Sequence, residues 1–243
     1  MRDQAGGQPP AEEEAAPLPH PRDFVAALGL LSALPLPRPD VHSPAFARAT
    51  LFFPVAGALL GCTLIGVHWA CARWLPAWAM AVVLTVLWEA ASGGAGLRAC
   101  GAAAGGRAGR TVLMVAALTA KAGALTVAAA AQPVIVLFAP LLARWGIVVL
   151  AAGARDAAAA GRKFNAAVGF REFALTSVLT FALLFSVAEA TGMLIVVCTA
   201  AAALGLRVWH HRRPGGVSWP LLLADAELLE ILVAVLIAAL RAR

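Results

Sequence analysis

Long apolar segments, separated by short polar or glycine-rich connections, fill the chain from about residue 50 to its end. A run of about 20 apolar residues is long enough to cross roughly 30 Å of hydrocarbon as a helix. A membrane β-barrel would instead show short alternating segments. The pattern therefore predicts an all-α, polytopic integral membrane bundle with about seven transmembrane helices: Leu51–Ala72, Pro76–Ala91, Thr111–Ala131, Pro133–Ala152, Glu172–Ala188, Thr191–Val208 and Pro220–Leu240.

The segment before the first predicted span divides into two parts. Residues 1–22 are polar, with three consecutive glutamates at positions 12–14, and they are expected to form a disordered cytoplasmic tail. Asp23–Leu34 predicts a short helix that starts near Asp23 and ends before Pro35. Because this helix is too short to cross a membrane, we expect it at the interface. Residues 23–243 are interpreted as one membrane helical domain.

Composition and charge support this interpretation and set the orientation. The chain is 61% hydrophobic, with a mean hydropathy of +0.83 and a formal net charge of +6. Lys and Arg are retained in cytoplasmic loops, and alternate connections of this chain hold fourteen of its nineteen basic residues. We therefore expect a bacterial inner (plasma) membrane protein whose N-terminus is cytoplasmic and whose C-terminus lies outside.

The basic residues are spread over several connections, so they indicate membrane lipid headgroups as the partner and no nucleic acid. A homo-oligomer and a membrane enzyme complex are alternative assemblies. The four cysteines form no CxxC pair, and neither a disulfide framework nor a metal site is predicted from them. His210 and His211 stand beside Arg212 and Arg213 and are expected in a basic interfacial loop.

Two cations lie inside predicted spans, where an isolated charge is unfavourable. Lys121 and Arg144 should therefore face the bundle and pair with acids. The candidate acids are Glu89, Asp225, Glu227 and Glu230. Two interpretations stay open: a polar cavity for an anionic ligand, with Glu227 or Glu230 accepting protons or holding a cation, and interhelical salt bridges alone.

The connection after the second predicted span, ASGGAGLRACGAAAGG at residues 91–106, is rich in glycine and alanine. Backbone amides of such a loop can cradle phosphate, and an arginine can bind phosphate through two parallel hydrogen bonds. Gly93, Gly94, Arg98 and Gly106 are therefore candidate substrate-binding residues, together with Lys121, Arg144 and Glu227. The stretch contains no carboxylate, so we assign it no metal ligand, and no catalytic residue is assigned in the chain.

Several landmarks, read in order, resemble the cobalamin synthase family of adenosylcobinamide-GDP ribazoletransferases. They are FVAALGLLSALPLP from Phe24, FARATLFFPVAGALLG from Phe46, APLLARWGIVVLAAGAR from Ala139 and RRPGGVSWPLLLADAELLEIL from Arg212. The resemblance extends over about Phe24 to Leu240. It implies attack of a ribose hydroxyl of α-ribazole, or its phosphate, on the diphosphate of adenosylcobinamide-GDP, with release of GMP in cobalamin biosynthesis.

The resemblance also shows a departure in the glycine-rich connection. The family carries three aspartates there that are expected to hold a divalent metal, and these places are taken by Arg98, Ala102 and Gly105. Gly96 stands at the position of a family histidine, whereas Glu227 matches the family's acidic closing helix. Mg²⁺ would be expected in an active member, but no cofactor is predicted for this chain.

Three functions follow as hypotheses. The first is a ribazoletransferase that holds its metal through Glu89, Glu227 or Glu230. The second is a non-catalytic paralogue that binds a corrinoid, a nucleotide or a lipid headgroup, or that scaffolds a membrane complex. The third, a small transporter, is ranked last because no inverted repeat is evident.

Overall fold

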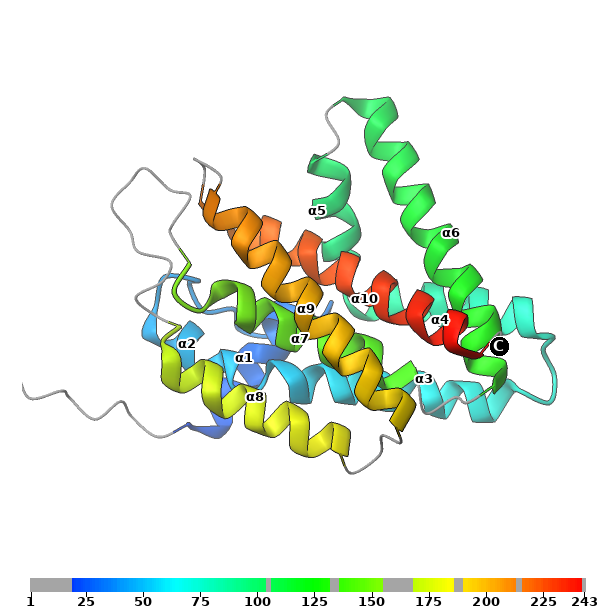
Figure 1. The fold of residues 1–243 in the computed structure, drawn as a ribbon, viewed down its shortest axis with the longest axis horizontal. Coiled ribbons are helices and arrows are strands. Elements are labelled where there is room, and N and C mark those ends of the chain that lie inside the picture. The colour runs from blue at the N-terminus through cyan, green and yellow to red at the C-terminus, as the bar shows by residue number, and fades with distance from the viewer. Residues whose placement is uncertain are drawn as a thin grey trace, which may run out of the picture.

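The computed structural model describes residues 19–103, 106–131, 136–154, 168–185, 190–212 and 216–241. Within these ranges the regular structure is entirely helical, so the predicted all-α fold is confirmed (Figure 1). The ten helices are α1 (Pro21–Leu31), α2 (Pro44–Thr50), α3 (Phe53–Cys71), α4 (Ala77–Ala91), α5 (Ala95–Ala103), α6 (Arg107–Ala131), α7 (Phe138–Ala151), α8 (Phe170–Phe185), α9 (Ala190–Arg212) and α10 (Trp219–Arg241).

A helix occupies each segment that the apolar pattern marks as a span, and α1 matches the predicted interfacial helix closely. Helix α1 begins as expected from its acidic start, because the Asp23 carboxylate accepts a hydrogen bond from the His20 amide at 2.8 Å. The same carboxylate pairs with Arg48 of α2 at 3.3 Å. Residues 1–18 of the expected tail lie outside the described residues.

Length and apolar character support fewer membrane spans than the seven expected. Among the described residues, α3, the Arg107–Val127 part of α6 and the Gly192–His210 part of α9 are long and apolar enough to cross a membrane. Helices α4 and α5 together form a fourth candidate, bent by 84° at the short turn between them. Helix α10 is 23 residues long but carries Asp225, Glu227 and Glu230. The molecule is thus a helical membrane bundle, and the count of seven is not confirmed.

The candidate spans expose much of their apolar surface. In the apolar stretches of these helices, only 33% of the residues of α3, 22% of those of α6 and 28% of those of α9 are buried inside the protein. On α6, for example, Val112 and Val115 are 68% and 55% exposed. Exposed apolar faces of this extent are expected where lipid, not water, surrounds the helices.

Glycines allow close contact between α3 and α7. A Cβ atom at Gly57 would lie 2.4 Å from the Pro140 carbonyl oxygen, and one at Gly61 would lie 2.7 Å from Leu137 Cα. The spacing of four residues places both glycines on one face of α3. This packing places α7 at the centre of the bundle, where every residue from Phe138 to Ala151 is buried.

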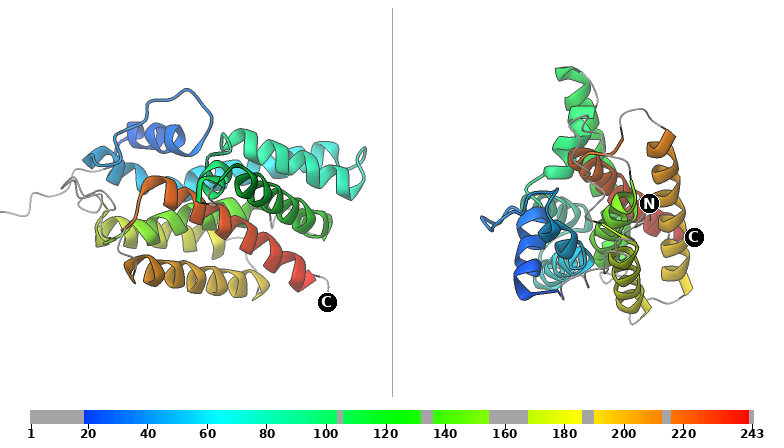
Figure 2. Two further views of the ribbon diagram at one scale, coloured as in Figure 1. Left: turned by 90° about the horizontal axis from the view of Figure 1, so that it is seen from above. Right: turned by 90° about the vertical axis from the view of Figure 1, so that its left-hand side faces the viewer.

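The ribbon views show how the chain crosses the molecule. Helices α3, α8, α9 and α10 run along the long axis, and the carboxyl end of α10 lies at the opposite end from α2 (Figures 1 and 2). Helix α5 and the first half of α6 project from the rest of the bundle (Figures 1 and 2). The orientation of the chain in the membrane stays a prediction.

The α3–α7 contact generates a stability prediction. Gly57→Ala should lower the stability of the bundle by about 1–3 kcal/mol, because the new methyl group meets backbone that cannot move aside. Gly66→Ala, on the same helix, is the control, since no atom lies within 4 Å of a Cβ there. Thermal unfolding in detergent measures both variants. Equal midpoints for the two would contradict the close contact.

Candidate functional site

A buried lysine from α6 lies among three carboxylates from two other helices. Lys121 Nζ is 2.5 Å from Glu89 Oε1, 2.6 Å from Glu227 Oε1 and 2.8 Å from Glu230 Oε2. The lysine is completely buried, and its ammonium also lies 4.8 Å from the centre of the Trp88 ring. We call Lys121, Glu89, Glu227 and Glu230, together with Arg144, the charge cluster.

Arg144 contributes the second cation from α7. Its guanidinium pairs with Glu230 Oε1, so that Glu230 bridges the two cations. The cluster therefore combines three formal negative charges with two positive charges, all on residues that are buried or nearly so. Such charges are stable in a membrane interior only as partners of one another.

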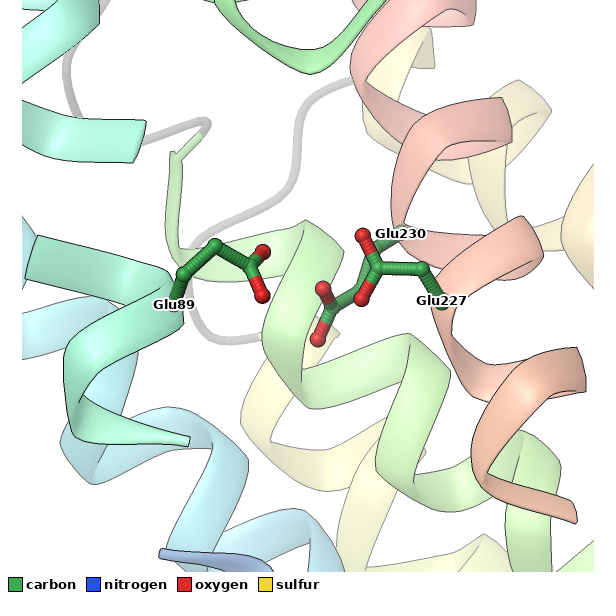
Figure 3. A group of neighbouring side chains, drawn as sticks. All are labelled: Glu89, Glu227 and Glu230. Carbon is green, nitrogen blue, oxygen red and sulfur yellow. The ribbon is translucent and has the colours of Figure 1, made fainter. Parts of the chain in front are cut away.

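Helix geometry explains why the acids converge. Glu227 and Glu230 are three residues apart, which places them on the same face of α10. Glu89 lies in the last turn of α4, across from them, and the three carboxylates point toward one another (Figure 3). Small residues bring the neighbouring helices close: a Cβ at Gly96 of α5 would lie 2.8 Å from Glu227 Oε2, and one at Gly146 of α7 would lie 2.3 Å from Leu229 Cδ1.

Lys121 and Arg144 pair with acids of other helices, as expected, and the structure brings both cations together with Glu227.

The glycine-rich connection, residues 91–106, has a different structure from the loop that its composition predicts. After a turn of three residues, Ala95–Ala103 forms α5, so Gly96 and Arg98 lie on a helix. The expectation of a loop through the whole stretch was wrong, because the alanines of α5 favour helix and only Gly96 and Gly101 interrupt them.

Gly93 and Gly94 form this turn and end α4. Both have positive φ angles, 66° and 60°, which glycine adopts readily. The Gly94 amide donates to the Glu89 carbonyl at 2.7 Å and the Gly93 amide donates to the Ala90 carbonyl at 3.1 Å, the pair of bonds that closes many helices. These two amides are therefore engaged within the turn in this conformation.

Arg98 and Gly106, the other two candidate residues of the glycine-rich stretch, follow this turn in the chain. The Arg98 side chain is exposed and donates to the Gly93 carbonyl. Gly106 has a φ of 71° and precedes α6, with open space around it. The structure thus brings Arg98 to Gly93 and Gly94, whereas no atom lies near a Cβ placed at Gly106. The role of these residues in substrate binding stays a prediction.

A cavity of about 350 Å³ lies beside the charge cluster, between α1, α3 and α4. Leucines and alanines make up most of its wall, and the hydroxyl-bearing residues Ser32 and Thr63 also line it. Arg144 is its charged residue, and the same side chain borders a space of about 20 Å³ next to Glu227 and Glu230. The cavity and the charge cluster therefore share Arg144.

Comparison with known proteins gives one family. The family model described as cobalamin-5-phosphate synthase matches residues 23–97. This match supports membership of the cobalamin synthase family. The match covers less than half of the chain. It suggests a role in cobalamin synthesis, and the apolar helices suggest a membrane protein. No curated protein and no solved structure matches the chain.

The matched segment covers α1 to α4 and the first turn of α5. Every residue that lines the 350 Å³ cavity, except Arg144, lies within it. Glu89 also belongs to this segment, whereas Lys121, Glu227 and Glu230 come from helices beyond it. The cobalamin synthase match thus contains the cavity but only one carboxylate of the charge cluster.

An active member of the cobalamin synthase family would be expected to use Mg²⁺. This ion does not fit the charge cluster in its present conformation. Ligand oxygens of Glu89, Glu227 and Glu230 lie within 4.8 Å of one another, which is close enough to surround an ion. However, Lys121 Nζ lies within 2.8 Å of an oxygen of each carboxylate. A divalent ion on the same oxygens would lie against the ammonium, and the two cations would repel each other.

The structure adds a buried pair that the sequence interpretation missed. His210 of α9 is 1% exposed, and its Nε2 lies 2.7 Å from Asp225 Oδ2 of α10. The expectation that His210 lies in an interfacial loop without a nearby acid was wrong. The two residues meet because the chain reverses direction between α9 and α10, and no spacing pattern in the sequence indicates this contact.

The charge cluster generates a stability prediction. Lys121→Met should lower stability by about 3–5 kcal/mol, because it leaves buried carboxylates without their shared partner. Arg107→Met is the control, since it removes an exposed cation from the same helix. Chemical unfolding of the purified variants in detergent measures the difference. A Lys121→Met variant as stable as Arg107→Met would show that the cluster does not hold the helices together.

Proposed function

We propose that this chain is a non-catalytic member of the cobalamin synthase family that binds a nucleotide of the α-ribazole type at the membrane. The observation that carries the proposal is the position of Lys121 Nζ among the three carboxylates. Displacement at phosphorus places charge on non-bridging oxygens, which a metal held by carboxylates ordinarily offsets. Here the three converging carboxylates are already engaged by a side chain of the protein.

The sequence of the glycine-rich segment supports the same conclusion. The positions that resemble the family's three metal-binding aspartates hold Arg98, Ala102 and Gly105. The structure places Arg98 on the exposed face of α5, where its guanidinium binds the Gly93 carbonyl. A cation at this place disfavours a divalent metal and favours an anionic group.

The cavity supports binding of a ligand of nucleotide size. Its volume of about 350 Å³ lies at the lower end of the range of roughly 300–1,000 Å³ for small-molecule pockets. A whole corrinoid is too large for this volume. An aromatic base would pack against the leucines, ribose hydroxyls would reach Ser32 and Thr63, and a phosphate would lie toward Arg144. A guanidinium has five N–H donors, so pairing with Glu230 leaves others for a second anion.

A second candidate function is the ribazoletransferase reaction itself, in which a ribose hydroxyl attacks the diphosphate of adenosylcobinamide-GDP and GMP leaves. The family match over residues 23–97 favours it, as does the convergence of Glu89, Glu227 and Glu230. It requires that Lys121 leave the carboxylates or that its ammonium replace the metal during transfer. A test of catalytic turnover distinguishes the two candidate functions.

Complementation of a bacterial strain that lacks its ribazoletransferase tests turnover. We expect no growth on cobinamide when this chain is expressed, because its carboxylates are already paired with cations of the protein. A family member with all three aspartates is the positive control, and immunoblotting of membranes confirms equal expression. Growth supported by the wild-type chain would establish the transferase and refute the non-catalytic proposal.

Isothermal titration calorimetry with α-ribazole 5′-phosphate tests the cavity. Ala90 lines the cavity, and Ala90→Phe should weaken binding by at least about tenfold, or about 1.4 kcal/mol, because the ring fills the space that the base needs. Ala70→Phe is the matched control on an exposed position of α3 outside the lining. Absence of binding to the wild-type protein, or equal affinities of the two variants, would refute this site.

A further inference from the structure

We infer that the Lys121 ammonium occupies the position of a divalent cation in a three-carboxylate site, and that removing this ammonium makes the cluster bind a metal ion. The inference concerns what the cluster can hold and does not rest on the proposed function. A transferase and a non-catalytic protein could both contain such an internal cation. No other assignment of this cluster follows from its family match, since four of its five members lie beyond residue 97.

The distances resemble those of an ion and its ligands. Nζ lies 2.5–2.8 Å from one oxygen of each carboxylate, and oxygen ligands surround Ca²⁺ at about 2.3–2.6 Å. Two ligands on opposite sides of Ca²⁺ are thus up to about 5 Å apart, and the three oxygens here lie within 4.8 Å of one another. Mg²⁺ requires oxygens at about 2.0–2.1 Å, so Ca²⁺ fits the present spacing with less movement.

Hydrogen-bond directions indicate that a spherical ion suits the carboxylates better than the ammonium does. Lys121 Nζ donates hydrogen bonds to Glu89 and Glu230. Glu227 Oε1 is close to Nζ, but among the described residues it has no hydrogen bond with acceptable geometry, and neither has the buried Glu89 Oε2. A metal ion has no fixed donor directions and could contact all three carboxylates at once.

The charges lead to the same conclusion. With Lys121 and Arg144 present, the three carboxylates leave a formal charge of −1 on the cluster. Loss of the lysine charge makes this −2, which one divalent ion neutralises. The space of about 20 Å³ beside Glu227 and Glu230 is large enough for one water molecule, which could complete the ligands of an ion.

The experiment compares Ca²⁺ binding to the full-length wild-type protein and to Lys121→Met, each purified in detergent without divalent ions. Titration calorimetry should give one Ca²⁺ per chain for Lys121→Met, at least about a hundredfold tighter than any binding to the wild type. The double variant Lys121→Met/Glu227→Gln should lose at least about tenfold of this affinity. Arg107→Met, which removes an exposed cation from the same helix, should bind Ca²⁺ no better than the wild type.

If Lys121→Met folds without metal, either of two results would overturn the inference. One is folded Lys121→Met that binds Ca²⁺ no more tightly than the wild type. The other is wild-type protein that already binds Ca²⁺ in a manner lost on Glu227→Gln, which would mean that the ammonium does not exclude an ion. If Lys121→Met unfolds without metal, its thermal midpoint with Ca²⁺ decides: a rise above that of Lys121→Met/Glu227→Gln supports the inference, and equal midpoints overturn it. Complementation reports separately on the proposed function.

Discussion

Burial of the Lys121 ammonium is the constraint on which the arrangement of the central helices depends. A charge in an apolar interior needs partners, and those of Lys121 on α6 come from α4 and α10. Arg144 of α7 joins the cluster through Glu230. Moving any one of these helices would leave a buried carboxylate or cation without its partner. The cluster therefore fixes the relative positions of helices that otherwise meet through small and apolar side chains.

The two ends of the chain contribute different parts of the site. The segment that matches the cobalamin synthase family forms the cavity between α1, α3 and α4. Helices beyond it provide Lys121, Arg144 and the two glutamates of α10, and these residues determine the charge next to the cavity. A cavity within the segment that resembles cobalamin synthases thus lies beside carboxylates that already pair with cations of the protein. This combination supports ligand binding more strongly than metal-assisted transfer.

Sequence reasoning predicted the helices well because apolar length is a direct consequence of the membrane solvent. It also predicted that Lys121 and Arg144 would pair with acids, since an unpaired charge in a span is unfavourable. It could not predict that one ammonium would contact three carboxylates, because that depends on how α4, α6 and α10 approach in space. It also missed α5, whose alanines favour helix, because the glycines at its start resembled a loop. The contact between His210 and Asp225 depends on how α9 and α10 lie together in space.

In this protein a side chain, and not a metal, pairs with the converging glutamates. An experimental structure of the wild-type protein crystallised with Mn²⁺, with anomalous scattering data, tests this assignment. We expect density for the Lys121 side chain reaching Glu89, Glu227 and Glu230, with no anomalous peak among them. An anomalous peak coordinated by these carboxylates, with Lys121 turned away, would contradict it.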